Sequence, residues 1–379
     1  MKLRRILFWI HLSAGVVAGT VIFIMATTGV ILAYERQIMR WANREYHADN
    51  NANQQRLSVT EILEKLKNTP TAITLRAESG TAVEVNFGRD RILFLNPYTG
   101  DALGESRRLP TFFTQVENIH RWIGVSDANR PTGRAITGAC NFAFFILVCT
   151  GPFIWWPKDW GWANLKKIIL FRRGLGGRAL YWNWHNVLGA WCVLPLFIIV
   201  LTGVIMSYGW ANNLLYRVTG NEPPVPPQSA SAQQRQRGEN RPHSASAEHP
   251  QESPFEKITA SAEQVPQSQS ITIRISPTRG PLSTTVDQGN GGRPDLRFQL
   301  TLDPKTGEVR QETFSSYNSG RRLRAWARFS HTGEAGGFVG QTIAAIAAAG
   351  ASVLFLTGIV LSVKRLLAWR RGRPARATA

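Results

Sequence analysis

Residues 10–30 read IHLSAGVVAGTVIFIMATTGV, and residues 184–204 read WHNVLGAWCVLPLFIIVLTGV. Each stretch contains a histidine that is followed by glycine four residues later and by Thr-Gly-Val seventeen residues later. The repeated positions are His11, Gly15 and Thr28 in the first stretch and His185, Gly189 and Thr202 in the second. About 20 consecutive apolar residues are enough to cross the hydrocarbon core of a bilayer. The two stretches therefore predict two transmembrane helices that are copies of one unit.

Two more apolar segments complete the predicted membrane part, and both carry the same dipeptide, at Thr150-Gly151 and Thr357-Gly358. The four segments are Leu7 to Ala33, Ile136 to Trp156, Val187 to Tyr208 and Thr342 to Val363. Each approaches or exceeds the length that spans a bilayer. We therefore predict a membrane α-helical fold with four transmembrane helices, built as a duplicated helix pair.

The positive charge of the chain has an uneven distribution. Lys and Arg outnumber Asp and Glu by 44 to 25, and the excess gathers before the first span, at 158–184 and at 367–379. Four crossings put these stretches on one side of the membrane, and the positive-inside rule makes that side cytoplasmic. We predict a multi-pass protein of the bacterial inner membrane with both termini cytoplasmic, and no nucleic-acid partner. For 158–184, contact with anionic membrane lipids is favoured over docking of a partner protein.

The two long loops, which would face the periplasm, share a second repeated signature of strands followed by an N/D-P-x-T-G turn. A helical pattern begins at Leu57 in the first loop. The strand-like runs are 72–75, 82–87 and 91–95 before the turn 96–100, and 271–275 and 296–302 before the turn 303–307. This pattern predicts two extracytoplasmic α+β modules.

Composition also predicts where the second loop lacks structure. Between Gly220 and Pro254 the chain is rich in Pro, Gln, Ser and Arg, so we expect a disordered insert there. His243 and His249 fall within it and receive no site role. The predicted organisation is a transmembrane helix at 1–34, a module with an interfacial helix at 35–133, a transmembrane helix at 134–157, a basic loop at 158–184, a transmembrane helix at 185–209, a module at 210–336, a transmembrane helix at 337–366 and a basic tail at 367–379.

Four of the seven histidines lie at the entrances of the four spans. His11 and His185 open the first and third spans, and His120 and His331 precede the second and fourth, so chain direction sorts them into an inner and an outer pair. Ionisable residues inside membranes are costly and usually functional, and neutral imidazole is an axial ligand of haem iron. Two ligands per face suit haem better than zinc, which needs three or four protein ligands. The sequence predicts two bis-histidine haems, held non-covalently because no C-x-x-C-H motif occurs.

Residues beside these histidines have two interpretations each. Gly15 and Gly189 lie one helical turn from His11 and His185, where they would leave a flat surface for a porphyrin. For Gly15 with Gly19, however, a G-x-x-x-G contact between helices is the simpler interpretation. Arg121 and Arg328, next to the outer pair, would neutralise haem propionates or contact lipid headgroups.

The sequence resembles the PepSY-associated transmembrane family, and within it the inner-membrane ferrisiderophore reductases of the FoxB type. The resemblance covers nearly the whole chain, includes the two outward loops as PepSY-like modules and leaves out the insert at 220–254. The residues that carry it are His11 with Gly15 and Thr28-Gly29, His120-Arg121, Trp184-His185-Asn186-Val187-Leu188-Gly189, and Ser330-His331-Thr332-Gly333-Glu334.

The resemblance implies two haem b groups, ligated by His11 with His185 and by His120 with His331. Electrons would pass from the cytoplasmic side to iron(III) held by a siderophore in the periplasm. Oxygen donors hold iron(II) less tightly than iron(III), so reduction would release the metal for uptake.

The electron donor is not encoded in this chain. The glycines at 174–177 lie in a basic connection without the strand, helix and acidic residue of a dinucleotide site, so the donor would be a quinol or a separate cytoplasmic flavoprotein. Two alternatives to the reductase remain at this point. One is a non-enzymatic membrane protein whose modules bind envelope peptides, proteins or a chelate, and the other is a haem-handling or assembly factor.

Overall fold

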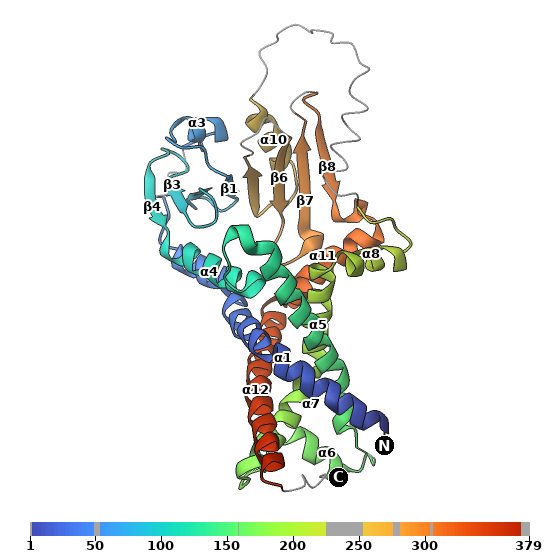
Figure 1. Ribbon diagram of the computed structural model, residues 1–379. Helices are drawn as coiled ribbons and strands as arrows, with labels where there is room; N and C mark the ends of the chain where they lie inside the picture. Colours follow the sequence, from blue (N-terminus) through green and yellow to red (C-terminus); the bar gives the residue numbers. More distant parts are fainter. Residues whose placement is uncertain are drawn as a thin grey trace. The chain divides into compact units, whose positions relative to one another are not determined.

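The computed structural model describes residues 2–48, 54–157, 159–224, 253–275, 281–303 and 306–372. The chain forms two compact units, which we call the helical unit and the sheet unit (Figure 1). The helical unit comprises Met1–Met39, Phe112–Ala211 and Trp326–Ala379, and the sheet unit comprises Arg40–Thr111 and Asn212–Ala325.

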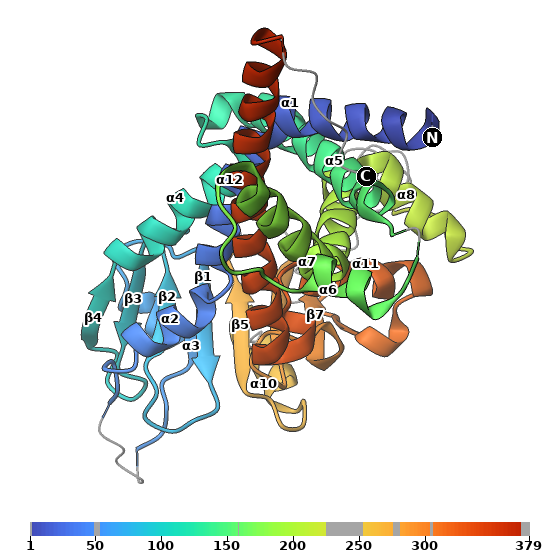
Figure 2. The same cartoon turned by 90° about the horizontal axis from the view of Figure 1, so that it is seen from below.

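Four long helices build the helical unit (Figures 1 and 2). They are α1 (Lys2–Leu32), α5 (Arg130–Trp155), α7 (Gly177–Ser207) and α12 (Gly337–Arg370). All four are long and apolar enough to cross a membrane, which agrees with the four predicted spans. Helix α1 packs against α5 and α12, and α7 packs against the same two helices. The two histidine-bearing copies, α1 and α7, therefore lie on one diagonal of the bundle.

Shorter helices precede or follow the long ones. They are α2 (Glu35–Ala42), α4 (Arg108–Trp122), α6 (Trp162–Ile169), α8 (Gly209–Val218) and α11 (Ser319–His331), with 3-10 turns η1 (Asp127–Asn129) and η4 (Glu334–Gly336). Helix α4 contains the interfacial segment that was predicted before His120, and it ends at Trp122. Helix α7 begins at Gly177, within the stretch 158–184 that was expected to be a loop.

Small residues let the long helices approach each other closely. Ala26, Ala347 and Ala351 lie in the buried middle of the bundle with Leu196 and Val200. Lipid tails give no hydrophobic drive for association, so close van der Waals packing of this kind stabilises helices in membranes.

The sheet unit consists of one antiparallel sheet of eight strands in the order β4-β3-β2-β1-β5-β6-β7-β8. Its strands are β1 (Ala72–Arg76), β2 (Val83–Asn86), β3 (Ile92–Leu95), β4 (Ala102–Ser106), β5 (Ser270–Arg274), β6 (Leu282–Asp287), β7 (Arg297–Leu302) and β8 (Val309–Thr313). The remaining elements are α3 (Val59–Glu64), α10 (Pro254–Glu263), η2 (Pro294–Leu296) and η3 (Phe314–Ser316).

The two outward modules that the sequence suggested are joined in this sheet. Strand β1 of the first half pairs with β5 of the second, with Ile73 opposite Ile273. Both residues belong to one apolar core that also contains Ile62 of α3 and Ile258 of α10. Each half thus contributes one helix and four strands to a shared sheet and core, instead of forming a module with a core of its own.

The repeated turn has the same hydrogen bonds in both halves. The amide of Gly100 donates to the carbonyl of Asn96 at 2.9 Å, and the amide of Gly307 donates to the carbonyl of Asp303 at 2.8 Å. Both glycines have φ values near the left-handed region, +76° and +66°, where a side chain would be strained. Each N/D-P-x-T-G turn therefore ends with the glycine that its backbone conformation requires.

Several predictions concern residues outside the described ranges. These include most of the insert expected at 220–254, with His243 and His249, and the end of the basic tail at 367–379 from residue 373 onward. Lys158 and the pair 304–305 are also outside them.

Candidate functional site

The first two histidines face each other across the diagonal of the bundle. The ring centroids of His11 on α1 and His185 on α7 lie 6.5 Å apart, with the rings at 80° to each other. The structure therefore brings together the pair that chain direction had placed on the inner side.

A threonine on a neighbouring helix holds each of these rings. The Nδ1 atom of His11 lies 2.9 Å from Oγ1 of Thr150 on α5. The Nδ1 atom of His185 lies 3.0 Å from Oγ1 of Thr357 on α12. The two contacts are equivalent in the duplicated helix pairs.

The second two histidines have equivalent contacts at the other end of the bundle. The Nδ1 atom of His120, at the end of α4, lies 2.9 Å from Oγ1 of Thr28 on α1. The Nδ1 atom of His331, at the end of α11, lies 3.3 Å from Oγ1 of Thr202 on α7 and 2.8 Å from the carbonyl oxygen of Ile199.

These hydrogen bonds determine the tautomer of each imidazole. All four threonine hydroxyls donate their proton to the carbonyl four residues earlier in their own helix. The distances are 2.7 Å for Thr28, 2.7 Å for Thr150, 2.6 Å for Thr202 and 2.8 Å for Thr357. Because a hydroxyl has one proton, its oxygen can only accept from the histidine. We therefore assign the proton of each neutral ring to Nδ1, which leaves the lone pair of Nε2 available for a metal.

The contacts form a reciprocal exchange within each half of the bundle. His11 of helix α1 contacts Thr150 of α5, and Thr28 of α1 contacts His120 of α4, the helix that precedes α5. Helix α7 and the pair α11 and α12 repeat this exchange with His185 and His331. The role of the threonines was missed in the sequence, although the Thr-Gly dipeptides late in the four predicted spans were the available signal.

The glycines of three of these dipeptides lie against the imidazole edges. A Cβ atom placed on Gly29 would lie 3.5 Å from Cε1 of His120, and one on Gly358 would lie 3.4 Å from Cε1 of His185. The corresponding distance from Gly151 to His11 is 3.9 Å. At Gly203 the nearest group is instead the side-chain amide of Asn141. In each of these dipeptides the threonine oxygen accepts from a histidine. In all but Thr202-Gly203, the glycine also leaves room for the imidazole edge.

Gly15 and Gly189 differ from Gly19 in what surrounds them. A Cβ atom on Gly15 or Gly189 would make ordinary contacts, 3.8 Å to Leu147 and 3.9 Å to Leu354. A Cβ atom on Gly19 would lie only 2.7 Å from the ring of Phe355. Helix packing therefore explains Gly19, whereas protein contacts do not require glycine at the other two positions. The flat surface for a porphyrin beside Gly15 and Gly189 stays a prediction.

Tight turns fix the outer histidines onto the helices that follow them. Gly133 on α5 lies against the carbonyl of Trp122, two residues after His120, and Gly340 on α12 lies against the carbonyl of Gly333, two residues after His331. Ile123 in the first turn has a φ of 57°, which costs a residue with a side chain about 1–2 kcal/mol. Packing around the first turn must offset this cost, whereas the second turn has a glycine, Gly333, at its left-handed position.

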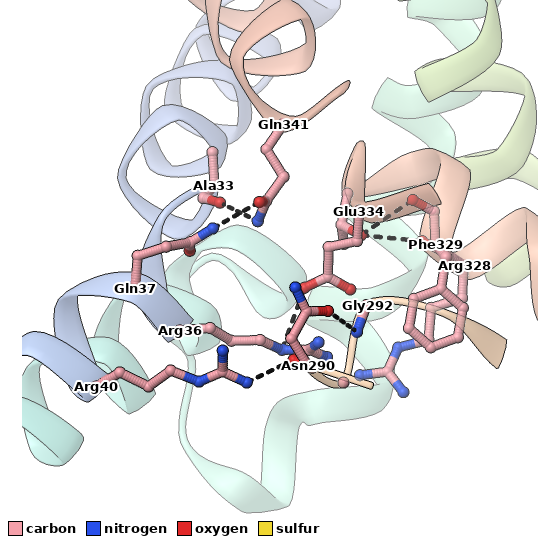
Figure 3. Close-up of polar contacts among 12 residues, drawn as sticks. Ala33, Arg36, Gln37, Arg40, Asn290, Gly292, Arg328, Phe329, Glu334 and Gln341 are labelled. Atoms are coloured by element: carbon pink, nitrogen blue, oxygen red, sulfur yellow. Dashed lines mark hydrogen bonds and ion pairs between the residues drawn. The ribbon is translucent and has the colours of Figure 1, made fainter. Parts of the chain in front are cut away.

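The arginines near the outer pair have partners within the protein. Arg121 forms an ion pair with Glu117 at 2.7 Å, and Arg328 lies over the ring of Phe329 at 5.6 Å. Their predicted role toward propionates is not tested by these contacts. Arg36, which the sequence analysis did not single out, forms an ion pair of 3.2 Å with Glu334, three residues after His331 (Figure 3).

Two glutamines strengthen the same region of the helical unit. The side-chain amide of Gln37 donates to Oε1 of Gln341 at 2.6 Å, and the amide of Gln341 donates to the carbonyl of Ala33 at 2.9 Å (Figure 3). These bonds connect the end of α1 and the start of α2 with α12, next to the segment that carries His331.

The ligand set at each end is small. Within the described ranges, no group of three or more His, Cys, Asp or Glu side chains is arranged to bind a metal ion. A structural zinc site needs four ligands, so a bare zinc ion would find too few protein ligands at either pair.

Comparison with known proteins agrees with this architecture. A family model described as PepSY-associated TM region matches residues 8–365. The chain belongs to that family. No curated protein matches the chain. Family membership and the four candidate spans establish a membrane protein of the PepSY-associated family, with an antiparallel sheet unit.

The threonine contacts should contribute measurably to stability. Thr28→Val removes the acceptor of His120 while keeping the side-chain shape. An unpaired buried donor costs about 1–3 kcal/mol, so the free energy of unfolding in detergent should fall by that amount. Thr20→Val, an exposed position on the same helix, should change it by less than about 0.5 kcal/mol. Equal effects of the two variants would contradict the assigned role of Thr28.

The close turn at Gly133 should be equally sensitive. A methyl group in Gly133→Ala would overlap the carbonyl of Trp122, and overpacking of this kind costs about 1–3 kcal/mol. Chemical denaturation in detergent measures the loss. Gly209→Ala is the control, because a Cβ atom there meets nothing within 4 Å, and it should be neutral or stabilising. A stable Gly133→Ala protein would show that the turn tolerates displacement.

Proposed function

We propose that this protein carries electrons across the bacterial inner membrane through two haem b groups, one between His11 and His185 and one between His120 and His331. The observation that carries the proposal is the orientation of the imidazoles. In every case Nδ1 is bound to a threonine oxygen, so Nε2 is the free nitrogen. Histidines that ligate metals typically have such a partner on the second nitrogen.

The donor set fits haem better than it fits other metal groups. Haem iron takes two axial ligands from the protein, and each end of the bundle offers two imidazoles. When bound, a haem with two histidine ligands takes up and releases single electrons without an open coordination position. The threonine contacts hold the rings in place, and apolar residues such as Leu196 and Val200 fill the middle of the bundle.

The spacing of the two pairs suits transfer between the two membrane faces. His11 and Thr28, which holds His120, lie seventeen residues apart on α1. At 1.5 Å per residue this corresponds to about 25 Å along the helix. The hydrocarbon core of a bilayer is about 30 Å thick, so each pair would lie near one surface. By the positive-inside rule the His11 and His185 pair would face the cytoplasm.

The proposed electron acceptor is a ferric siderophore in the periplasm, and the donor is a quinol or a separate flavoprotein. Support for the acceptor comes from the likeness of the histidine motifs to those of FoxB-type reductases. One electron converts the chelated iron(III) to iron(II), whose bonds to hard oxygen donors are weaker. No acid, base or nucleophile is needed at the acceptor, so catalysis consists of holding redox centres in place and letting the acceptor approach.

A second candidate function rests on the sheet unit. A cavity of about 530 Å³ is lined by residues of α3, α10 and the adjoining strands, with apolar side chains such as Leu75 and Ile271 beside polar ones such as Arg56, Glu263 and Ser270. Its size and lining would suit a peptide or a chelate. In that case the protein would be a non-enzymatic binding protein, and the histidines would need no haem. A haem-handling factor is the third possibility, with the same histidines holding haem transiently.

Haem content distinguishes these functions. Protein purified in detergent from cells with ample haem should contain two low-spin haems per chain in a pyridine haemochrome assay. Replacing any one of the four histidines by alanine should leave one, because each ring supplies one of two axial ligands. His47→Ala, which changes an exposed histidine of the sheet unit, should keep both.

Other outcomes would favour the other functions. A colourless protein would support the binding protein, and less than one exchangeable haem would support the haem-handling factor. If each substitution removed both haems equally from a folded protein, the pairing would be wrong.

Electron delivery is tested separately. After reduction with dithionite, the protein should be reoxidised by a ferric hydroxamate or catecholate chelate, and an iron(II)-specific trap should capture the released metal. His331→Ala should slow this reoxidation, because the outer pair is the proposed exit. If the protein contains both haems but no ferric chelate reoxidises them, the electron relay would stand and the ferric siderophore would be wrong as the acceptor.

A further inference from the structure

The connection between α6 and α7 contains a small pocket that the electron-transfer proposal does not use. It has a volume of about 220 Å³. Its walls are Lys167, Arg172, Leu175, Ala179, Trp182 and Asn183. Two of these side chains are cationic, none is acidic, and three are apolar.

Hydrogen bonds to the buried side chain of Asn183, and one from Trp191, give this pocket a defined shape. Asn183 is only 2% exposed. Its Oδ1 accepts from the backbone amide of Arg172 at 3.0 Å, and its Nδ2 donates to the carbonyl of Leu170 at 3.3 Å. The indole of Trp191 donates to the carbonyl of Ile169 at 2.9 Å. The end of α6 and the following turn are thus attached to α7 at three points.

The charges of the pocket select an anion. Nζ of Lys167 donates one hydrogen bond, to Asn164 at 3.0 Å, and has two further protons to give. Within the described part of the chain the Arg172 guanidinium forms no ion pair. A bound phosphate would satisfy both cations.

The surroundings favour a lipid over a free anion. Trp182 is 46% exposed, and Trp162 and Trp191 are more than 60% exposed on the neighbouring surfaces of α6 and α7. Tryptophan is enriched where a membrane meets water. Basic pockets beside transmembrane helices on the cytoplasmic side bind anionic lipid headgroups, and the positive-inside rule would place this pocket on that side.

We propose that the pocket binds the phosphate of an anionic phospholipid through Lys167 and Arg172, with Trp182 against the glycerol and upper acyl region. The acyl chains would continue along the exposed apolar face of α7. This site is independent of the histidine pairs, so it stands or falls without the proposed haem function.

The test measures lipid retention by the full-length protein. Native mass spectrometry in detergent would count bound phosphatidylglycerol, with phosphatidylcholine as the uncharged reference lipid. The pocket variant is Lys167→Gln with Arg172→Gln. The control is Lys166→Gln with Arg173→Gln, which removes the same charge from the same connection but does not line the pocket. The loss of two lipid contacts should reduce the affinity for phosphatidylglycerol about thirtyfold in the pocket variant, and the control should remain within about threefold of wild type.

Three results would overturn the proposal. The first is an equal loss in both variants, which would indicate general attraction to charge. The second is no preference of the wild type for phosphatidylglycerol. The third is full displacement of the lipid by millimolar inorganic phosphate, which would make this a site for free anions. If the double variant does not fold, Arg172→Gln against Arg173→Gln gives the same comparison.

Discussion

The helical unit depends on the fact that a threonine hydroxyl has one proton to donate. In an apolar bundle that proton goes to a helical carbonyl of the same chain, since no water competes for it. The oxygen then accepts only from the histidine, which must carry its proton on Nδ1. The four threonines thereby orient the four imidazoles, and Nε2 is left as the free nitrogen of each ring.

The two halves of the chain repeat the same arrangement in both units. In the helical unit the two halves exchange histidine and threonine contacts in the same order, and Gly133 and Gly340 make the same close approach in the two outer turns. In the sheet unit the halves contribute one helix and four strands each, and they meet where β1 pairs with β5. Within the described residues, Asn141 beside Gly203 and the positive φ of Ile123 are two differences between the halves.

The sequence was sufficient to predict the four candidate spans and the approach of His11 to His185, because apolar length and chain direction are properties of the chain alone. The pairing of β1 with β5 was not predictable, since it joins Ile73 to Ile273 across a long stretch of chain and other strands have a similar apolar face. Edge strands β4 and β8 were missed because each has a single large apolar residue, Leu103 in β4 and Val309 in β8, so neither shows apolar alternation. Arg36 was missed because its partner Glu334 lies almost three hundred residues away.

A common interval along the helices places the two histidine pairs. His11 and Thr28, His185 and Thr202, Gly133 and Thr150, and Gly340 and Thr357 are all seventeen residues apart. In each helix one end of the interval serves the inner pair and the other end serves the outer pair. One inserted residue would rotate the far end by about 100° and turn a threonine away from its histidine. The interval therefore has to be kept in all four helices together, and its length of about 25 Å sets the separation of the two pairs.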